Sequence, residues 1–150
     1  MIKNRGFEVV KKCENHEINL PKRMTKNAAG YDIEAAEDTH FAPGEIVLVP
    51  TGLKSYMQDD EVLYLYNRSS FPKKRGLILL NAVGVIDADY YNNSDNEGHI
   101  FVQMKNIFED EVKIGKGERI AQAVFAKILL ADGDENAEKN SRNGGFGSTK

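Results

Sequence analysis

The end of the chain combines residue types that can hold an anion and a flat ring. Residues 142–150 read Arg-Asn-Gly-Gly-Phe-Gly-Ser-Thr-Lys. The glycines, Gly147 among them, allow backbone N–H groups to approach an anion closely, and the hydroxyls add donors. Arg142 can clamp a terminal phosphate, and Phe146 can lie against a planar base. A disordered polar terminus explains the same composition, and the tail by itself leaves both interpretations open.

A carboxylate that could act as a general base follows a short apolar run. Residues 84–90 read Gly-Val-Ile-Asp-Ala-Asp-Tyr, and Asn81 precedes them. A carboxylate directly after an apolar strand and next to a tyrosine has limited contact with solvent, which suits proton abstraction. A β-turn in which Asp87 or Asp89 bonds its own backbone explains this pattern equally simply.

Other polar residues could bind phosphates or a metal ion. Arg68, Ser69 and Ser70 stand at the predicted start of a helix, which is either a phosphate site or a plain helix cap. Asp32 could hold a hydrated Mg²⁺, or could simply be an exposed carboxylate on a strand. Gln122 interrupts an apolar strand, and a buried amide needs a partner, which is either a structural group or a ligand.

The elements that must position these residues are short strands. Apolar runs separated by turn residues, without sustained helical periodicity, predict strands at 7–10, 31–36, 45–50, 62–67, 77–81, 99–107, 111–114 and 120–130. In the run 100–105, apolar Ile, Val and Met alternate with Phe, Gln and Lys, as a half-buried strand requires. The run 62–66 is apolar on both faces and should lie between two layers. Only one short helix is predicted, near 69–74, capped by Ser69 or Ser70. This pattern predicts an all-β fold, either a sandwich, a jelly roll or a barrel.

The chain divides at residue 131. We expect a β core at 1–130, a polar flexible linker at 131–141 and a glycine-rich lid at 142–150. Fully extended, this linker could span about 35–40 Å, enough to reach a neighbouring subunit.

Composition narrows the class of protein. The net charge of −3 argues against a general nucleic-acid binder, and the single cysteine, Cys13, excludes an intramolecular disulfide. No signal-like or membrane-spanning apolar run is present in the sequence. We therefore expect a soluble cytoplasmic protein with no direct nucleic-acid or membrane partner.

Taken together and in order, these segments resemble the five motifs of the trimeric dUTPases (deoxyuridine triphosphate nucleotidohydrolases). The matching segments are 29–33, 67–70, 81 with 84–90, 117–122 and 142–149. The resemblance extends from about residue 20 to the end of the chain.

The resemblance implies a distorted jelly roll or β-clip barrel with one short helix, assembled as a homotrimer with C-terminal arms. Each interface site would take motifs one, two and four from one chain, the uracil pocket from a second and the tail from the third. The reaction would convert dUTP and water to dUMP and pyrophosphate, which limits uracil incorporation into DNA and supplies dUMP for dTMP synthesis.

It also implies residue roles. Asp87 would activate the water that attacks the α-phosphorus, and Asp32 would hold Mg²⁺ through water. The phosphate chain would be fixed by Arg68, Ser69, Ser70 and Gln122. The uracil edge would be read by Asn81 and the backbone of Gly84, Val85 and Ile86. Tyr90 would lie under the sugar and exclude a 2′-hydroxyl. The tail would close with Arg142, Gly147, Ser148 and Thr149 at the γ-phosphate and Phe146 over the uracil.

The sequence departs from the family pattern after Tyr90, where residues 91–98 form a longer loop. Asn143 replaces a usual glycine, and Lys150 ends the chain where glycine is common. One alternative is a dCTP deaminase of the same fold, which would need a Glu as proton shuttle in the motif-three strand. The other is a non-catalytic nucleotide-binding or regulatory module, which would not need the base Asp87.

Overall fold

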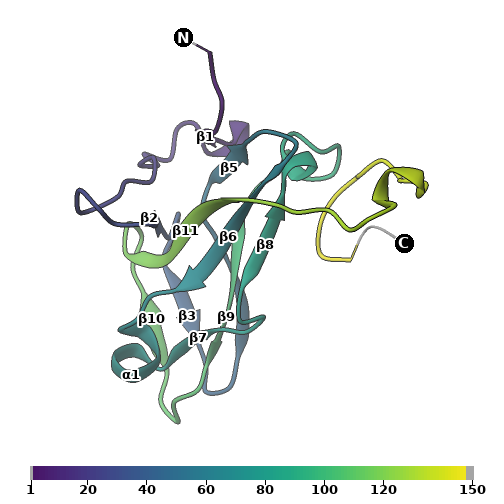
Figure 1. The fold of residues 1–150 in the computed structure, drawn as a ribbon. Helices are drawn as coiled ribbons and strands as arrows, with labels where there is room; N and C mark the ends of the chain where they lie inside the picture. Colours follow the sequence, from purple (N-terminus) through teal and green to yellow (C-terminus); the bar gives the residue numbers. More distant parts are fainter. Residues whose placement is uncertain (1, 148–150) are drawn as a thin grey trace.

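Short antiparallel strands make up most of the regular structure in the computed structural model, which describes residues 2–147 (Figure 1). In chain order the strands are β1 (Gly6–Val9), β2 (Tyr31–Glu34), β3 (Thr39–Phe41), β4 (Ile46–Pro50), β5 (Leu53–Tyr56), β6 (Glu61–Asn67), β7 (Leu77–Leu79), β8 (Gly84–Asp87), β9 (Phe101–Asn106), β10 (Val112–Ile114) and β11 (Arg119–Lys127). The helical segments described are α1 (Phe71–Arg75) and the 3₁₀ turns η1 (Lys11–Cys13), η2 (Ala88–Tyr90) and η3 (Asp134–Asn136).

A four-stranded sheet carries most of the residues singled out above. Its strand order is β2-β11-β6-β8, and every neighbouring pair is antiparallel. β2 and β8 are therefore its opposite edges. Asp32 on β2 and Asp87 on β8 are thus separated by two whole strands of the same sheet.

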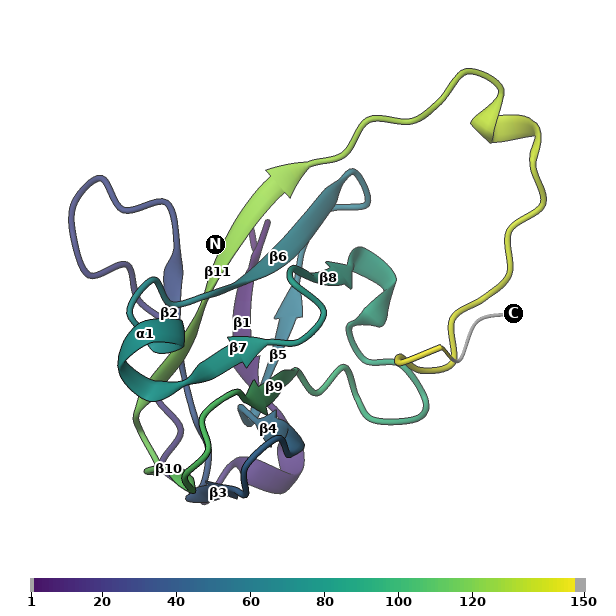
Figure 2. The same ribbon diagram turned by 90° about the horizontal axis from the view of Figure 1, so that it is seen from below.

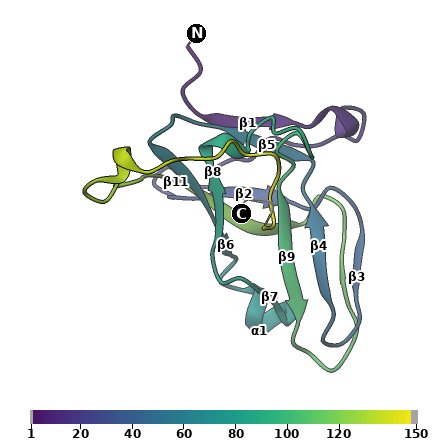
Figure 3. The same cartoon turned by 90° about the vertical axis from the view of Figure 1, so that its right-hand side faces the viewer.

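The remaining strands form smaller sheets around the same core. The orders are β4-β9-β7, β1-β5 and β10-β3, and Figure 3 shows β1 and β5 at one end of the fold, with α1 and β7 at the other. The expected all-β fold with one short helix is confirmed. Within the described residues, however, the strands form separate sheets and do not close into one barrel, so a jelly-roll description fits better.

The core lies between the four-stranded sheet and the β4-β9-β7 sheet. Ile33, Leu63 and Ile120 from the first meet Val102 and Met104 from the second, and all five are fully buried. Each such side chain contributes about 1.5–3 kcal/mol by leaving water. The predicted alternation at 100–105 is confirmed, because β9 turns Val102 and Met104 inward and leaves Phe101, Gln103 and Lys105 partly exposed. This alternation orients the outer face of β9 toward the site.

Burial of the run 62–66 is only partly as expected. Val62, Leu63 and Leu65 are buried, whereas Tyr66 is 36% exposed and Tyr64 is half-buried. In one chain, therefore, the outer face of β6 is covered at Val62 but open to solvent at Tyr66.

Three strands, β3, β5 and β8, are absent from the predicted strand ranges, although the apolar run before Asp87 was treated as a strand, and one helix cap was predicted wrongly. β3 and β5 carry polar residues such as His40 and Lys54, which interrupt the apolar runs from which strands were predicted. Ser70 occupies the N-cap position of α1 but makes no side-chain cap bond. Its backbone is already helical, whereas a capping side chain needs an extended backbone. The helix ends at Gly76, whose left-handed φ of 62° and close contact with Phe108 leave no room for a side chain.

The segment after β11 is mostly irregular within the described residues. β11 ends at Lys127, earlier than predicted, and Leu129 beyond it is 96% exposed. The chain then swings away from the body, forms η3 and returns to the loop that follows η2 (Figure 2).

Within residues 2–147, no helix is long and apolar enough to cross a membrane.

Candidate active site

A pocket of about 220 Å³ lies beside β8. This volume is below the range of about 300–1,000 Å³ typical of sites for drug-sized ligands, so it suits a base and sugar better than a whole nucleotide. Its walls come from β6, β7, β8, η2, β9 and the tail: Leu65, Leu79, Asn81, Gly84, Val85, Ile86, Asp87, Tyr90, Ile100, Phe101, Gln103, Arg142, Gly145 and Phe146. All the residues predicted to hold the uracil and sugar thus come together.

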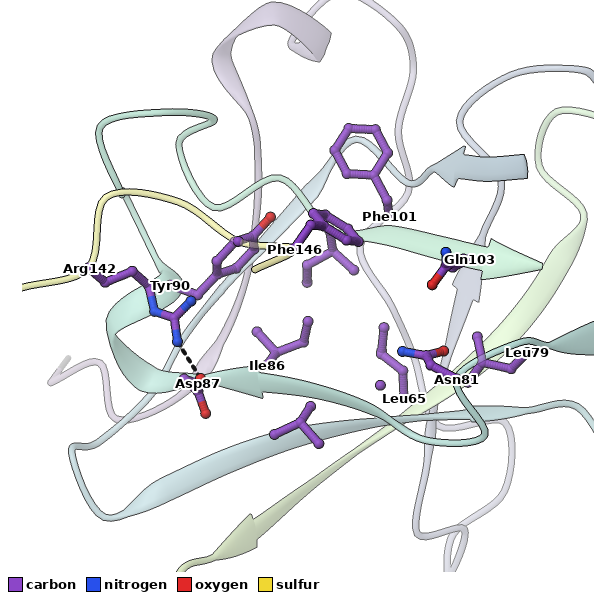
Figure 4. A pocket seen from close by; sticks show the side chains of 14 residues that line it. Leu65, Leu79, Asn81, Ile86, Asp87, Tyr90, Phe101, Gln103, Arg142 and Phe146 are labelled. Atoms are coloured by element: carbon purple, nitrogen blue, oxygen red, sulfur yellow. Dashed lines mark hydrogen bonds and ion pairs between the residues drawn. The ribbon is translucent and has the colours of Figure 1, made fainter. Parts of the chain in front are cut away.

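Asp87 stands at one end of this pocket. It is the last residue of β8, and its side chain is 50% exposed, so it can reach a ligand without being desolvated. Asn81 and Gln103 lie together at the opposite end (Figure 4). Gly84 packs against Leu65 so closely that an added Cβ would lie 2.9 Å from the Cβ of Leu65, which brings the backbone of β8 to the pocket wall.

Tyr90 forms a fixed wall between these ends. The side chain is 6% exposed, its hydroxyl donates to the carbonyl of His99 at 2.6 Å, and the hydroxyl accepts from Asn96 Nδ2 at 2.8 Å. Burial raises the pKa of Tyr90, so the group stays a neutral phenol. A ring held in this way can exclude an extra substituent on a sugar.

The C-terminal tail reaches this pocket through Arg142. Its Nη2 donates to Asp87 Oδ2 at 2.5 Å (Figure 4). Its Nε donates to Asp89 Oδ1 at 2.7 Å. The Arg142 side chain is only 17% exposed. The guanidinium predicted to meet a phosphate is therefore paired, in this structure, with the candidate base and its neighbour Asp89.

Phe146 lies at the pocket mouth between Tyr90 and Phe101. Its ring meets that of Phe101 edge-on, with centroids 6.2 Å apart, and the residue is 64% exposed. Gly147 follows it with a left-handed φ of 87°. Ser148 and Thr149, also expected to bind phosphate, lie outside the described residues.

The tail covers the pocket of its own chain. This differs from the expectation that it would reach only a neighbouring subunit's pocket. The physical reason is the irregular path 128–141, which is long enough to turn back toward η2 (Figure 2).

A second pocket, of about 530 Å³, collects residues predicted to bind phosphates and metal. Asp32, Arg68 and Arg119 line it, together with Asn19, Leu20, Lys22, Met24, Glu34, Gly117 and Glu118. Arg68 Nη1 donates to the carbonyl of Arg119 at 3.2 Å, and its guanidinium lies 5.5 Å from the ring of Phe71. These contacts hold Arg68 at the wall of the pocket that Asp32 also lines.

Gln122 pairs with Asp32 across β11 and β2, so it lies next to this second pocket. An added Cβ on Gly30 would lie 2.6 Å from Gln122 Oε1, so a larger residue there would displace the Gln122 amide. Ser69 and Ser70 stand at the start of α1 and do not line the second pocket. They are adjacent to Arg68 in the chain without a described contact to Asp32.

The two pockets share no lining residue. Gln122 on β11 pairs with Asp32 on one side and with Tyr66 of β6 on the other. Asp87 pairs with Val62, which lies four residues from Tyr66 along β6. From strand spacing and rise, Asp32 and Asp87 are therefore separated by roughly 14 Å across the sheet and roughly 13 Å along it. One phosphate group of a ligand cannot meet both carboxylates of one chain.

Several site residues were missed by the sequence predictions. Phe101 and Gln103 line the first pocket, Asp89 pairs with Arg142, and Arg119 pairs with Asp32 at 3.4 Å. The alternation along β9 places Phe101 and Gln103 on the same face, so the sequence pattern could have predicted that these two residues lie together. Asp89 and Arg119 fall within the matched motifs, but nothing in the sequence indicates their ion-pair partners.

Known proteins resemble this chain along almost its whole length. A curated deoxyuridine 5′-triphosphate nucleotidohydrolase from Lactococcus lactis subsp. lactis (strain IL1403) is 66% identical over 148 residues, which covers 99% of each chain. Another of that name, from Rickettsia felis, is 37% identical and covers 93% of this chain and 94% of its own.

Solved structures give the same result. The crystal structure of dUTPase from Streptococcus mutans matches with a TM-score of 0.82 and 57% identity, covering 85% of this chain and 99% of that one. The dUTPase from phage phi11 of S. aureus, at 21% identity and a TM-score of 0.73, shares the fold. The family model for dUTPase matches residues 16–150, and the chain belongs to the dUTPase family.

Proposed function

We propose that this chain hydrolyses dUTP to dUMP and pyrophosphate, and so limits uracil incorporation into DNA and supplies dUMP for dTMP synthesis. The observation that carries the proposal is the position of Asp87 at the edge of a base-sized pocket walled by Tyr90 and Asn81. Family membership supports the same substrate.

In the proposed reaction, Asp87 orients a water molecule and takes its proton as the oxygen attacks the α-phosphorus. Its half-exposed carboxylate can accept that proton directly. The bond to the bridging oxygen then breaks, and pyrophosphate leaves. Because Arg142 bonds Asp87 in this structure, the guanidinium must shift toward the phosphates when the substrate binds.

Base and sugar selection would use the rest of the pocket. The amides of Asn81 and Gln103 lie where a pyrimidine edge could enter, and the β8 backbone at residues 84–86 supplies further polar groups. An amide site that satisfies uracil leaves unpaired groups against the exocyclic amine of cytosine. The buried ring of Tyr90 would exclude a 2′-hydroxyl by contact.

Phosphate and Mg²⁺ binding would use the second pocket. Within residues 2–147 no three potential His, Cys, Asp or Glu ligands gather to form a metal cage. Asp32 is a single carboxylate, and Mg²⁺ commonly binds through one or two carboxylates, waters and substrate phosphates, so the residues fit an ion carried by the triphosphate. When bound, such an ion would neutralise charge on the phosphates. Arg68, with Ser69, Ser70 and Gln122 nearby, would hold the phosphate chain.

A complete site would require more than one chain. The distance between Asp32 and Asp87 supports a site in which one chain supplies Asp87 and another supplies Asp32 and Arg68. The outward face of the four-stranded sheet supports an interface there, because Tyr64 and Val85 are cross-strand partners on that face and Val85 is 58% exposed. We propose a homotrimer, as in the family, acting in the cytoplasm.

The tail would act as the lid. Arg142, Gly147, Ser148 and Thr149 would meet the γ-phosphate, and Phe146, already at the pocket mouth, would cover the uracil. Glu97 does not support the deaminase alternative, since its carboxylate is held by Lys54 at 2.8 Å and does not line the pocket.

Pyrophosphate release from dUTP, dCTP, dTTP and UTP with Mg²⁺ tests the proposal. We expect dUTP to be hydrolysed at least about a hundredfold faster than each of the others, because cytosine leaves polar groups unpaired, the 5-methyl group of thymine adds bulk to the base, and the 2′-hydroxyl of UTP clashes with Tyr90. Equal rates on all four nucleotides would exclude this specificity, and release of ammonia from dCTP would indicate a deaminase.

A further inference from the structure

The loop at residues 91–98, longer than the family pattern, lies against the C-terminal tail. It contains two non-glycine residues with left-handed backbone, Asn92 at φ 55° and Glu97 at φ 65°. Such conformations cost free energy and persist only where surrounding contacts hold them. The loop therefore has a defined conformation that its own contacts hold in place.

Side-chain amides hold the loop from inside. Asn93, only 8% exposed, accepts through Oδ1 from the backbone N–H groups of Asp95 and Asn96, both at 3.0 Å. Its Nδ2 donates to the carbonyl of Tyr90 at 2.7 Å. Asn96 Nδ2 in turn donates to the Tyr90 hydroxyl, so the loop and the pocket wall form one bonded unit.

Lys54 fixes the same loop to the core. Its side chain is 10% exposed, and its Nζ donates to Asn92 Oδ1 at 2.7 Å and to Glu97 Oε1 at 2.8 Å. The hydrogen bond from Lys54 lowers the pKa of Glu97, so this carboxylate stays ionised and the pair persists.

The tail contacts the outer edge of this rigid loop. The N–H of Asp95 donates to the carbonyl of Asn143 at 3.0 Å, and Ser94 Oγ lies 3.4 Å from the same oxygen. Gly144 is buried, and an added Cβ would lie 2.8 Å from Asp95 Oδ2. An added Cβ on Gly145 would lie 2.7 Å from the ring of Tyr90. The loop thus presents a shape that fits this glycine pair.

We propose that loop 91–98 is the docking site of the C-terminal tail, with Ser94 and Asp95 as positioning residues for the lid. When the loop binds Asn143 and Gly144, Arg142 lies beside Asp87 and Phe146 lies at the mouth of the first pocket. A tail on a long irregular linker loses much conformational entropy when it closes over the pocket. Because the loop is already ordered, binding the tail to it does not require the loop to lose conformational entropy as well. What the docked tail contributes to turnover rests on the proposed function.

A double-mutant cycle tests the dock by kinetics. Asp95→Lys places a longer, cationic side chain against Gly144 and near Arg142. We expect about a tenfold fall in kcat/KM for dUTP in the full chain, and no fall in a chain that ends at Ser141. Asp95→Asn, which keeps the size and the N–H, should restore near-normal activity. An equal fall in both chains, or no fall in the full chain, would overturn the proposal.

Cross-linking tests the contact without any nucleotide. The pair Ser94→Cys with Asn143→Cys should form a disulfide under mild oxidation at least about tenfold faster than the control pair Glu109→Cys with Asn143→Cys. A disulfide within or between chains supports the dock, and its connectivity identifies the protomer that supplies the tail. Rates no faster than the control pair would overturn the dock, even if the enzyme hydrolyses dUTP normally.

Discussion

At the scale of single residues, Asp87 would carry the proposed chemistry, and Arg142 is bonded to it in this structure. The same carboxylate that would take a proton from water accepts a 2.5 Å bond from Arg142. Asp89 shares that guanidinium but lies off the pocket lining. The two neighbouring carboxylates therefore have separable roles.

Asp87→Asn should lower kcat for dUTP by about 10²–10⁴-fold, because the amide cannot take a proton from water. Binding of a non-hydrolysable dUTP analogue, measured by calorimetry, should remain within about tenfold of wild type. The matched control is Asp89→Asn, which removes a negative charge beside Arg142 but keeps an acceptor oxygen, and it should cost less than about tenfold in kcat. A fully active Asp87→Asn enzyme would remove Asp87 as the base.

His99 gives the fold a sensitivity to acid. The residue is 1% exposed, its Nε2 accepts from the N–H of Gly52 at 2.9 Å, and its Nδ1 has no hydrogen-bond partner within residues 2–147. Burial lowers the pKa of His99 from 6.5 to about 4, so the folded chain holds the neutral ring.

The unfolded chain therefore takes up a proton at His99 before the folded chain does. The contribution to stability is fully present above pH 6.5 and is lost as the pH falls toward 4, by about 3 kcal/mol in all. Urea unfolding at several pH values measures this. His99→Gln keeps an acceptor for Gly52 without titrating, so its stability should fall less over this interval. An identical slope in both proteins would contradict the assignment.

The sequence identified most of these residues but not their partners. Asp87, Asn81, Tyr90 and Phe146 were predicted from motif order, and all of them line one pocket. The pairing of Arg142 with Asp89 could not be predicted, because it depends on where an irregular linker returns to the body.

At the scale of elements, the four-stranded sheet positions the two carboxylates, whereas the tail covers the first pocket. The strand register of the sheet fixes the positions of Asp32 and Asp87. The alternation of apolar and polar residues predicts some of these strands, but not how they pair. β3 and β5 were missed because polar residues such as Lys54 are buried there through pairing with loop groups, a tertiary effect that local patterning does not encode.

Deleting residues 142–150 should lower kcat for dUTP by at least about a hundredfold, because the lid that aligns the triphosphate is lost. The thermal midpoint should change by less than about 3 °C, since the core strands end at Lys127. Steady-state kinetics and a melting curve on the same protein measure both. An unchanged kcat would show that the tail is not a lid.

At the scale of the whole molecule, the separation of the two pockets is the main result. Three strand spacings and four residues of register keep Asp32 and Asp87 roughly 20 Å apart. The family resemblance implies that each site is shared between chains, and this distance within one chain supports that proposal on independent, geometric grounds. Cyclic symmetry would join each half to its complement on a neighbour.

Subunit mixing tests this account most directly. Asp87→Asn disables one half and Arg68→Ala the other, so each homotrimer should be inactive. Random mixed trimers contain one intact site when both chain types are present, which predicts recovery of about a quarter of wild-type dUTP hydrolysis at equal mixing. Size-exclusion chromatography with two affinity tags confirms that mixed trimers form. Mixed trimers as inactive as either parent would contradict a site shared between subunits.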